Sequence, residues 1–80
     1  MARYADNFEK NRINRLQKLK PEKYGGKIIH FAKDQTYYGT KIIAYNIKII
    51  GAMGKYIILS TAKTKEEAFE KAKDEIDKIF

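Results

Sequence analysis

The residues that could take part in catalysis are few in this 80-residue chain. The sequence contains no cysteine and one histidine, His30, within the apolar run Lys27 to Phe31. Six acids between residues 64 and 80 lie near lysines at helical spacing, as Glu67 does near Lys71, so local ion pairs account for them. Catalysis needs a nucleophile with a base, paired carboxylates or a bound metal, and the sequence shows none of these patterns. We therefore expect a protein that is not an enzyme and that requires no cofactor or metal.

Basic and aromatic side chains offer a second kind of chemistry, the binding of a polyanion. Residues 1–63 carry 13 Lys and Arg against four acids, or +9, whereas residues 64–80 carry 4 Lys against six acids, or −2. Such a basic body favours nucleic acid, and less often an anionic membrane or an acidic protein; the same charge also serves solubility alone. In a nucleic-acid interface, lysines neutralise phosphates and flat side chains contact bases or sugars. The candidate binding residues are Arg12, Arg15, Lys18, Lys20, Lys23, Lys41, Asn46, Lys48, Lys55 and Tyr56.

The first of these basic residues lie in a predicted helix. Residues 1–5 lack periodicity and are predicted to form a flexible arm. Asp6 or Asn7 can cap a basic helix over residues 6–20, which Pro21 ends. We expect this helix either to dock by its narrow apolar stripe or to fold on contact with an anion. The stripe recurs at i, i+3 and i+6: Ile13, Leu16 and Leu19.

Three strands are predicted between residues 27 and 60. The first covers Lys27 to Phe31 and ends at a polar Lys-Asp-Gln turn. The second, Lys41 to Ile50, divides by period two into two faces, and the face that holds Asn46 and Lys48 is assigned to solvent. The opposite face is assigned to the core and holds Ile43, Tyr45, Ile47 and Ile49.

The Gly-Ala-Met-Gly segment that follows is predicted to close a hairpin, because its glycines suit positive φ. The third strand, Lys55 to Ser60, has an open register. A four-residue loop places Tyr56 and Ile58 inside, and a slip of one residue reverses every side chain. We favour the alternative with Ile57 and Leu59 inside, which leaves Tyr56 on the outer face.

The firmest helix signal is Thr64-Lys65-Glu66-Glu67, a capping box in which a hydroxyl and a carboxylate accept hydrogen bonds from orphan amides. Apolar residues then follow helical spacing: Ala68, Phe69, Ala72, Ile76, Ile79 and Phe80. The sequence thus predicts one α+β domain over residues 6–80 with the order α-β-β-β-α. Its three-stranded antiparallel sheet, residues 27–60, carries the C-terminal helix, residues 64–80, packed on one face. No signal peptide or membrane span is evident, so we expect a cytoplasmic protein.

Residues 41–75 carry a series of short motifs. They are apolar strand positions at Ile43, Tyr45 and Ile47, the turn Gly54-Lys55, the strand end Leu59-Ser60-Thr61 and the helix start Thr64-Lys65-Glu66-Glu67-Ala68. In these motifs the chain resembles the DNA-binding domain of the ethylene-response-factor (Apetala) type and its relatives in integrase arms and homing endonucleases. The resemblance implies that the outer sheet face enters the DNA major groove with the helix behind it. The arginines and tryptophans of that family correspond here to Asn46, Lys48, Tyr56 and Ile58.

The order α-β-β-β-α, with Thr64, Lys65 and Ala68 near the second-helix signature, is also similar to a double-stranded RNA-binding domain. That family clasps phosphates at the helix N-terminus, where Glu66 and Glu67 would here repel them, so DNA ranks above RNA as the expected partner. The leading expectation is a small DNA-binding protein of a mobile element. The alternative is a phage-type protein that inhibits a nucleic-acid enzyme, in the manner of an anti-CRISPR. The oligomeric state and the target sequence stay open.

Overall fold

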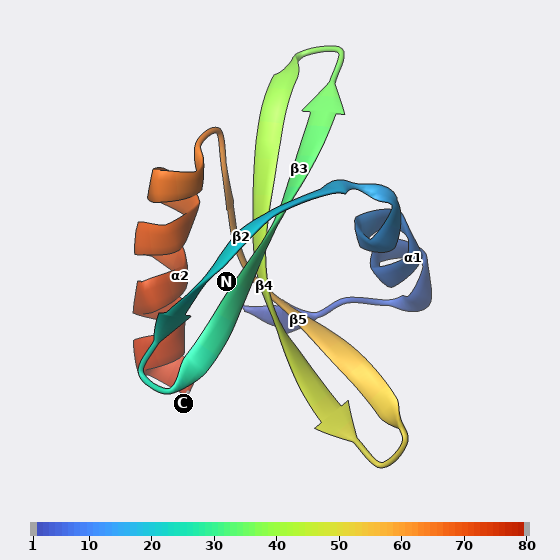
Figure 1. Ribbon diagram of the computed structural model, residues 1–80, viewed down its shortest axis with the longest axis vertical. Helices are drawn as coiled ribbons and strands as arrows, with labels where there is room; N and C mark the ends of the chain where they lie inside the picture. The colour runs from blue at the N-terminus through green and yellow to red at the C-terminus, as the bar shows by residue number, and fades with distance from the viewer. Residues whose placement is uncertain (1, 80) are drawn as a thin grey trace.

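The computed structural model describes residues 2–79, in which a sheet lies between two helices (Figure 1). Five antiparallel strands follow the spatial order β1-β5-β4-β3-β2. The α+β class is confirmed, but the predicted three-stranded sheet with one covered face is wrong. Met1 of the predicted arm and Phe80 of the predicted helix lie outside the described residues. The elements are β1 (Arg3–Tyr4), α1 (Asn7–Arg15), β2 (Gln17–Tyr24), β3 (Lys27–Thr36), β4 (Gly39–Ile50), β5 (Met53–Ala62) and α2 (Lys65–Ile79).

Helix α1 begins at a predicted cap but ends earlier than predicted. The Asp6 carboxylate accepts a hydrogen bond from the Glu9 amide at 2.8 Å, and the Glu9 carboxylate accepts one from the Asp6 amide at 3.4 Å. This capping box satisfies orphan groups at the helix start. At the other end, the Lys18 ammonium donates to the backbone carbonyls of Ile13 and Leu16. A lysine predicted to lie inside the helix therefore closes it instead.

The residues after α1 form an edge strand, β2, which corrects the helix predicted over residues 6–20. Ile13 and Leu16 contact the apolar cluster on the side of the sheet that α1 covers (the α1 side). Leu19 packs instead against the cluster under α2 (the α2 side). One helical stripe cannot reach both faces of a sheet, so the i, i+3, i+6 spacing did not indicate a helix here. Pro21 lies in a bulge of this edge strand, where a missing amide is tolerated.

Strand β3 continues past its predicted end at Phe31. The polar residues assigned to a turn lie inside the strand, because Asp34 is buried in an ion pair with Arg12 of α1. The turn is instead Tyr37-Tyr38, which joins β3 to β4. In the sequence, Lys33-Asp34-Gln35 looks like a turn because it is polar. The ion pair that allows Asp34 to be buried in a strand comes from Arg12 of α1, which is distant in the sequence.

Both faces of the central strands are apolar, and β4 is oriented opposite to the prediction. The α2 side is built from Ile29, Phe31, Ile42, Ala44, Ile57 and Leu59. The α1 side is built from Ala32, Ile43, Tyr45 and Ile58, with Ile13 of α1 over them. Ile57 and Leu59 thus lie under the C-terminal helix as expected, but the face of β4 with Tyr45 turns away from it. Strand alternation defines two faces without deciding which helix covers each.

The β4–β5 hairpin closes through a two-residue turn and not through the predicted four-residue segment. Ile50 pairs with Met53, and Gly51 takes the positive φ of 62° that such a turn requires. This register places Lys55 directly opposite Lys48.

The predicted flexible arm contains strand β1 at the other edge of the sheet. Arg3 and Tyr4 pair with Ile58 and Ile57 of β5. The Arg3 guanidinium also forms an ion pair with Glu9, which holds the pKa of that carboxyl below its usual value. The arm therefore connects α1 to the sheet.

Helix α2 lies on one face of the sheet, as the sequence predicts. The Thr64 hydroxyl accepts a hydrogen bond from the Glu67 amide at 3.2 Å, and Ala68, Ala72 and Ile76 are buried. The two alanines permit close approach to the strands, because they add little bulk between helix and sheet. No helix of residues 2–79 is long and apolar enough to cross a lipid bilayer.

Candidate nucleic-acid interface

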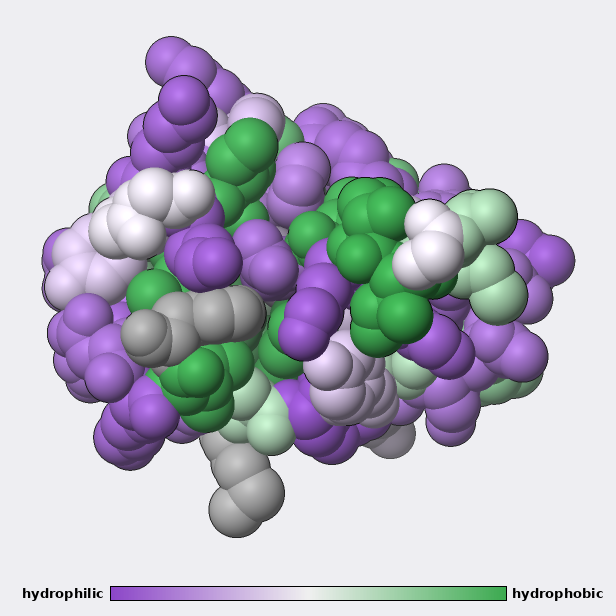
Figure 2. Space-filling model, turned by 90° about the horizontal axis from the view of Figure 1, so that it is seen from below, coloured by the Kyte–Doolittle hydropathy of each residue, from purple (hydrophilic) through white to green (hydrophobic). Residues whose placement is uncertain are grey.

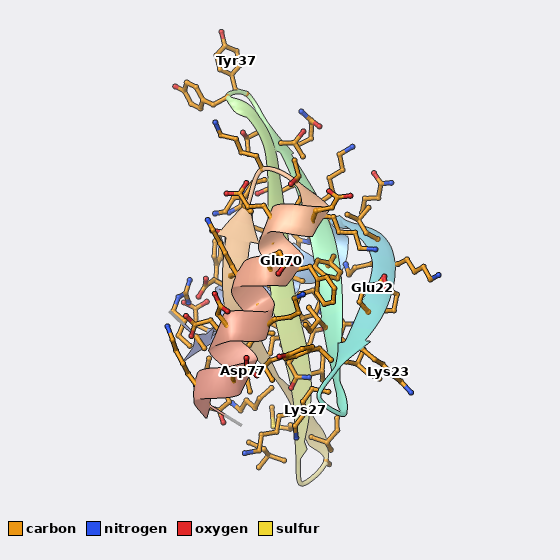
Figure 3. All side chains as sticks on the ribbon, turned by 90° about the vertical axis from the view of Figure 1, so that its left-hand side faces the viewer. Glu22, Lys23, Lys27, Tyr37, Glu70 and Asp77 are labelled. Atoms are coloured by element: carbon orange, nitrogen blue, oxygen red, sulfur yellow. The ribbon has the colours of Figure 1, made fainter. Side chains whose placement is uncertain are left out.

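Charge is segregated between the layers of the molecule. Helix α2 carries most of the acids, and part of that charge is locally paired, as Glu70 is with Lys73 at 3.0 Å. Figure 3 shows Glu70 and Asp77 on the outer surface of α2, and Lys23 and Lys27 toward the end of the β2–β3 hairpin. Most acids therefore lie on α2, whereas α1 and β2 carry mostly basic residues; the two surfaces meet where Lys65 of α2 pairs with Glu22 of β2 at 3.4 Å.

A row of three rings crosses the α1 side of the sheet. Tyr45 is stacked between His30 and Tyr56, with ring centroids 5.3 Å and 5.1 Å away. The Lys10 ammonium lies 5.6 Å from the centroid of the Tyr56 ring and donates to the Gly54 carbonyl at 3.0 Å. Burial raises the pKa of Tyr45 to about 12 and lowers the pKa of His30. Because Tyr45 is stacked between two rings and is 2% exposed, it supports the fold and offers no open face to a ligand.

Beyond this row the two hairpins separate. Pairing between β3 and β4 stops at His30 and Tyr45, although β2–β3 and β4–β5 each continue to their turns, so the hairpin ends diverge at the lower end of Figure 1. The cleft between them, called the notch below, has a volume of about 520 Å³. Its lining is Gly26, Lys27, Ile28, His30, Asn46, Ile47, Lys48 and Ile49.

The notch combines cationic, polar and apolar groups, and none of its lining residues within the described chain is acidic. Lys27 and Lys48 come from opposite hairpins. Asn46 is buried and donates its side-chain amide to the Ile28 carbonyl at 2.8 Å, which ties the two hairpins together. Ile49 is 70% exposed. Figure 2 looks at this end of the molecule and shows groups of apolar side chains among hydrophilic ones.

Lys48 and Lys55 form a like-charge pair across β4 and β5. Both side chains are exposed, and neither forms an ion pair with a carboxylate of residues 2–79. Like charges directly opposite each other destabilise a hairpin. A bound anion would remove that repulsion.

The structure divides the predicted binding residues between the two sides of the sheet. On the α1 side lie Arg12, Arg15, Lys18, Lys23, Lys41 and Tyr56. On the α2 side, beyond the buried core, lie Asn46, Lys48 and Lys55, while Lys20 occupies the β2 bulge. No single free sheet face presents them together, which corrects the predicted arrangement.

Several of these residues already have partners in the fold. Arg12 pairs with the buried Asp34, and Lys18 closes α1. The Tyr56 hydroxyl donates to the Asn14 side-chain oxygen at 2.6 Å. Side chains of these kinds can bind nucleic acid, but here the contacts of Arg12, Lys18 and Tyr56 stabilise the fold.

Sequence reasoning did not select Lys10, Lys27 and His30, which the structure brings to the ring row or the notch. The alternation in Lys27 to Phe31 gave no sign that β4 would pair with this strand only as far as Tyr45. The register of β5 follows from the length of the turn: a two-residue turn at Gly51-Ala52 pairs Ile50 with Met53, and this turn length could have been considered from the sequence.

Comparisons of the chain with protein-family models, with curated proteins and with solved structures find no match. The resemblance of residues 41–75 to the ethylene-response-factor type of domain therefore stays a prediction.

Proposed function

We propose that this protein binds nucleic acid, with DNA as the expected target, through the notch and the basic residues around it. The observation that carries the proposal is the lining of the notch, where Lys27 and Lys48 converge from two hairpins and no acid is present among the described lining residues. A phosphate backbone suits this surface, because lysines that neutralise phosphates release the counterions condensed on the nucleic acid.

The repulsion between Lys48 and Lys55 supports the same ligand class. Two adjacent ammonium groups without carboxylate partners are a cost to the free protein, and a polyanion with regularly spaced phosphates offsets that cost. An uncharged partner would leave the repulsion in place.

Exposed basic residues extend this surface from the notch along β2, at Lys20 and Lys23. The insertion of a free outer sheet face into a groove, which the resemblance implies, is not part of the proposal. The sheet face opposite α2 is not free, because α1 covers part of it and Tyr45 on that face is 2% exposed. The proposed contact is instead made by the diverging hairpin ends.

The test measures the affinity for a short labelled DNA duplex by fluorescence anisotropy between about 50 and 200 mM salt. The variant Lys48→Gln/Lys55→Gln is expected to bind more weakly and to lower the slope of log affinity against log salt by about two, because two phosphate contacts are lost. The control Lys73→Gln/Lys78→Gln removes the same charge from α2, outside the notch, and is expected to keep the parent slope.

Two outcomes contradict the proposal. If both variants weaken binding equally, affinity depends on net charge alone and the notch is not the site. If the parent does not bind duplex or single-stranded nucleic acid even at low salt, the proposal fails, and the predicted alternative of a protein partner, such as a nucleic-acid enzyme, takes its place.

A further inference from the structure

The tip of the β3–β4 hairpin, at the opposite end of the molecule from the notch, presents two tyrosines to solvent. Tyr37 and Tyr38 are each 96% exposed, more than any other large apolar or aromatic side chain described as exposed. Their ring centroids lie 5.3 Å apart at an interplanar angle of 83°, so each ring keeps an open face. Figure 3 shows Tyr37 at the end of the molecule, pointing away from the sheet and from α2.

Other residues hold the turn together. The Thr36 hydroxyl donates to the Gly39 carbonyl at 2.7 Å, and the Thr40 hydroxyl donates to the Gln35 side-chain oxygen at 3.0 Å. Gly39 takes a positive φ of 126°, which a side chain would disfavour. A buried aromatic ring removes about 150–250 Å² from water, and neither tyrosine gains this. Two rings at a position that small polar residues usually occupy indicate a role outside the fold.

A basic hollow lies beside the base of this hairpin. Its volume is about 590 Å³, and its lining includes Lys41, Lys63, Lys71 and one acid, Glu67. Glu67 lies 3.5 Å from Lys71, so the charge of that pair is locally balanced. Lys41 follows Tyr38 by three residues, a distance of about 10 Å along an extended strand. An open ring face and two cations thus lie within reach of neighbouring nucleotides.

We propose that the Tyr37–Tyr38 tip stacks on unpaired bases of a nucleic acid while Lys41 and Lys63 hold the adjacent phosphates. This inference rests on the proposed function and deepens it, because it names single-stranded segments as the preferred substrate. Stacking on aromatic rings beside a basic groove tolerates any sequence, since every base has a π-face. The tip and the notch lie at the two ends of a molecule 36 Å long (Figure 1), so one strand that spans this length can reach both.

Paired bases do not fit this tip. The faces of bases inside a duplex are covered by their neighbours, and a side chain reaches them only as a wedge between two base steps. Two rings set at 83° to each other cannot enter one step together. The flanking Gln35, Thr36 and Thr40 are polar and hydrogen-bonded, so the tip also lacks the apolar surroundings of a segment that inserts into a lipid layer.

The test compares the affinity for a single-stranded oligonucleotide with that for a duplex of the same sequence, each as DNA and as RNA, at one salt concentration. The variant Tyr37→Ala/Tyr38→Ala is expected to bind the single strand about tenfold more weakly for each stacked base lost, and to bind the duplex as the parent does. The variant Tyr37→Phe/Tyr38→Phe keeps both rings and is expected to match the parent. Circular dichroism should give the same unfolding midpoint for all three proteins, because the tip lies outside the core.

The outcomes separate this inference from the proposed function. Equal losses of single-strand and duplex affinity overturn base stacking, and so does a loss in the Phe variant, which would assign the effect to the hydroxyls. If Lys48→Gln/Lys55→Gln weakens binding but the Ala variant does not, the function stands and the tip inference falls. If no nucleic acid binds at low salt, both fall. The DNA and RNA arms identify which polymer supplies the bases.

Discussion

Replacing Ile13 by alanine tests whether α1 belongs to the folded core or is a basic arm that folds only on an anion. Ile13 is 2% exposed and is the buried residue of α1. It packs on Ala32, Ile43, Tyr45 and Ile58 of the sheet. If α1 were detached, the α1 side would be open to solvent, as the prediction of a free outer face requires.

The magnitude follows from what the substitution removes. Three carbon atoms leave a buried site, and at about 0.8 kcal/mol each the transfer term is about 2.4 kcal/mol. A cavity term adds to this, and measured Ile→Ala changes in protein cores cost about 2–5 kcal/mol, so we expect a loss of about 3 kcal/mol in the free energy of unfolding for Ile13→Ala. In a domain of this size, each kcal/mol lowers the melting temperature by about 4–8 °C.

Urea unfolding followed by circular dichroism measures this loss. Phe8→Ala is the matched control, because Phe8 lies on the same helix but is 78% exposed. It should change the free energy of unfolding by less than about 0.5 kcal/mol. Equal, small effects of the two substitutions would refute the assignment of α1 to the core and restore a free outer sheet face.

Three further substitutions probe other parts of the structure. Arg12→Gln leaves the buried Asp34 without its counter-charge; we expect a loss of about 1–2 kcal/mol, moderated because Arg12 is half exposed, and a double-mutant cycle with Asp34→Asn should show coupling. Burial holds the pKa of His30 below 6.5, so the unfolded state binds the proton more readily. The free energy of unfolding should therefore fall as the pH drops through 6.5 toward the folded-state pKa, and the variant His30→Gln should lack this pH dependence. Asn46→Ala removes the bond to the Ile28 carbonyl; a loss of about 1 kcal/mol and faster amide exchange beside the notch are expected, and unchanged exchange would show that the hairpins need no tie.

Part of the candidate site could be predicted from sequence and part could not. The excess of Lys and Arg before residue 64, and the acids after it, are properties of the chain that folding preserves. The notch was not predictable, because it depends on where β3 and β4 stop pairing, and that is set by the twist and divergence of whole hairpins. The exposure of Tyr37 and Tyr38 was not predictable either, because the two residues could equally have belonged to the end of one strand or the start of the next.

Local signals in the sequence determined the helix caps at Asp6 and Thr64, the α+β class and the segregation of charge, because each depends on neighbouring residues or on composition. Tertiary structure alone decided which face of β4 lies under α2, and that Leu19 belongs to an edge strand and not to a helix. Both faces of the central strands carry isoleucine, so the period-two pattern allowed either orientation. The orientation of β4 follows from the burial of both apolar faces of the sheet, one against α1 and the other against α2. That burial becomes favourable only when the two helices and the sheet pack together.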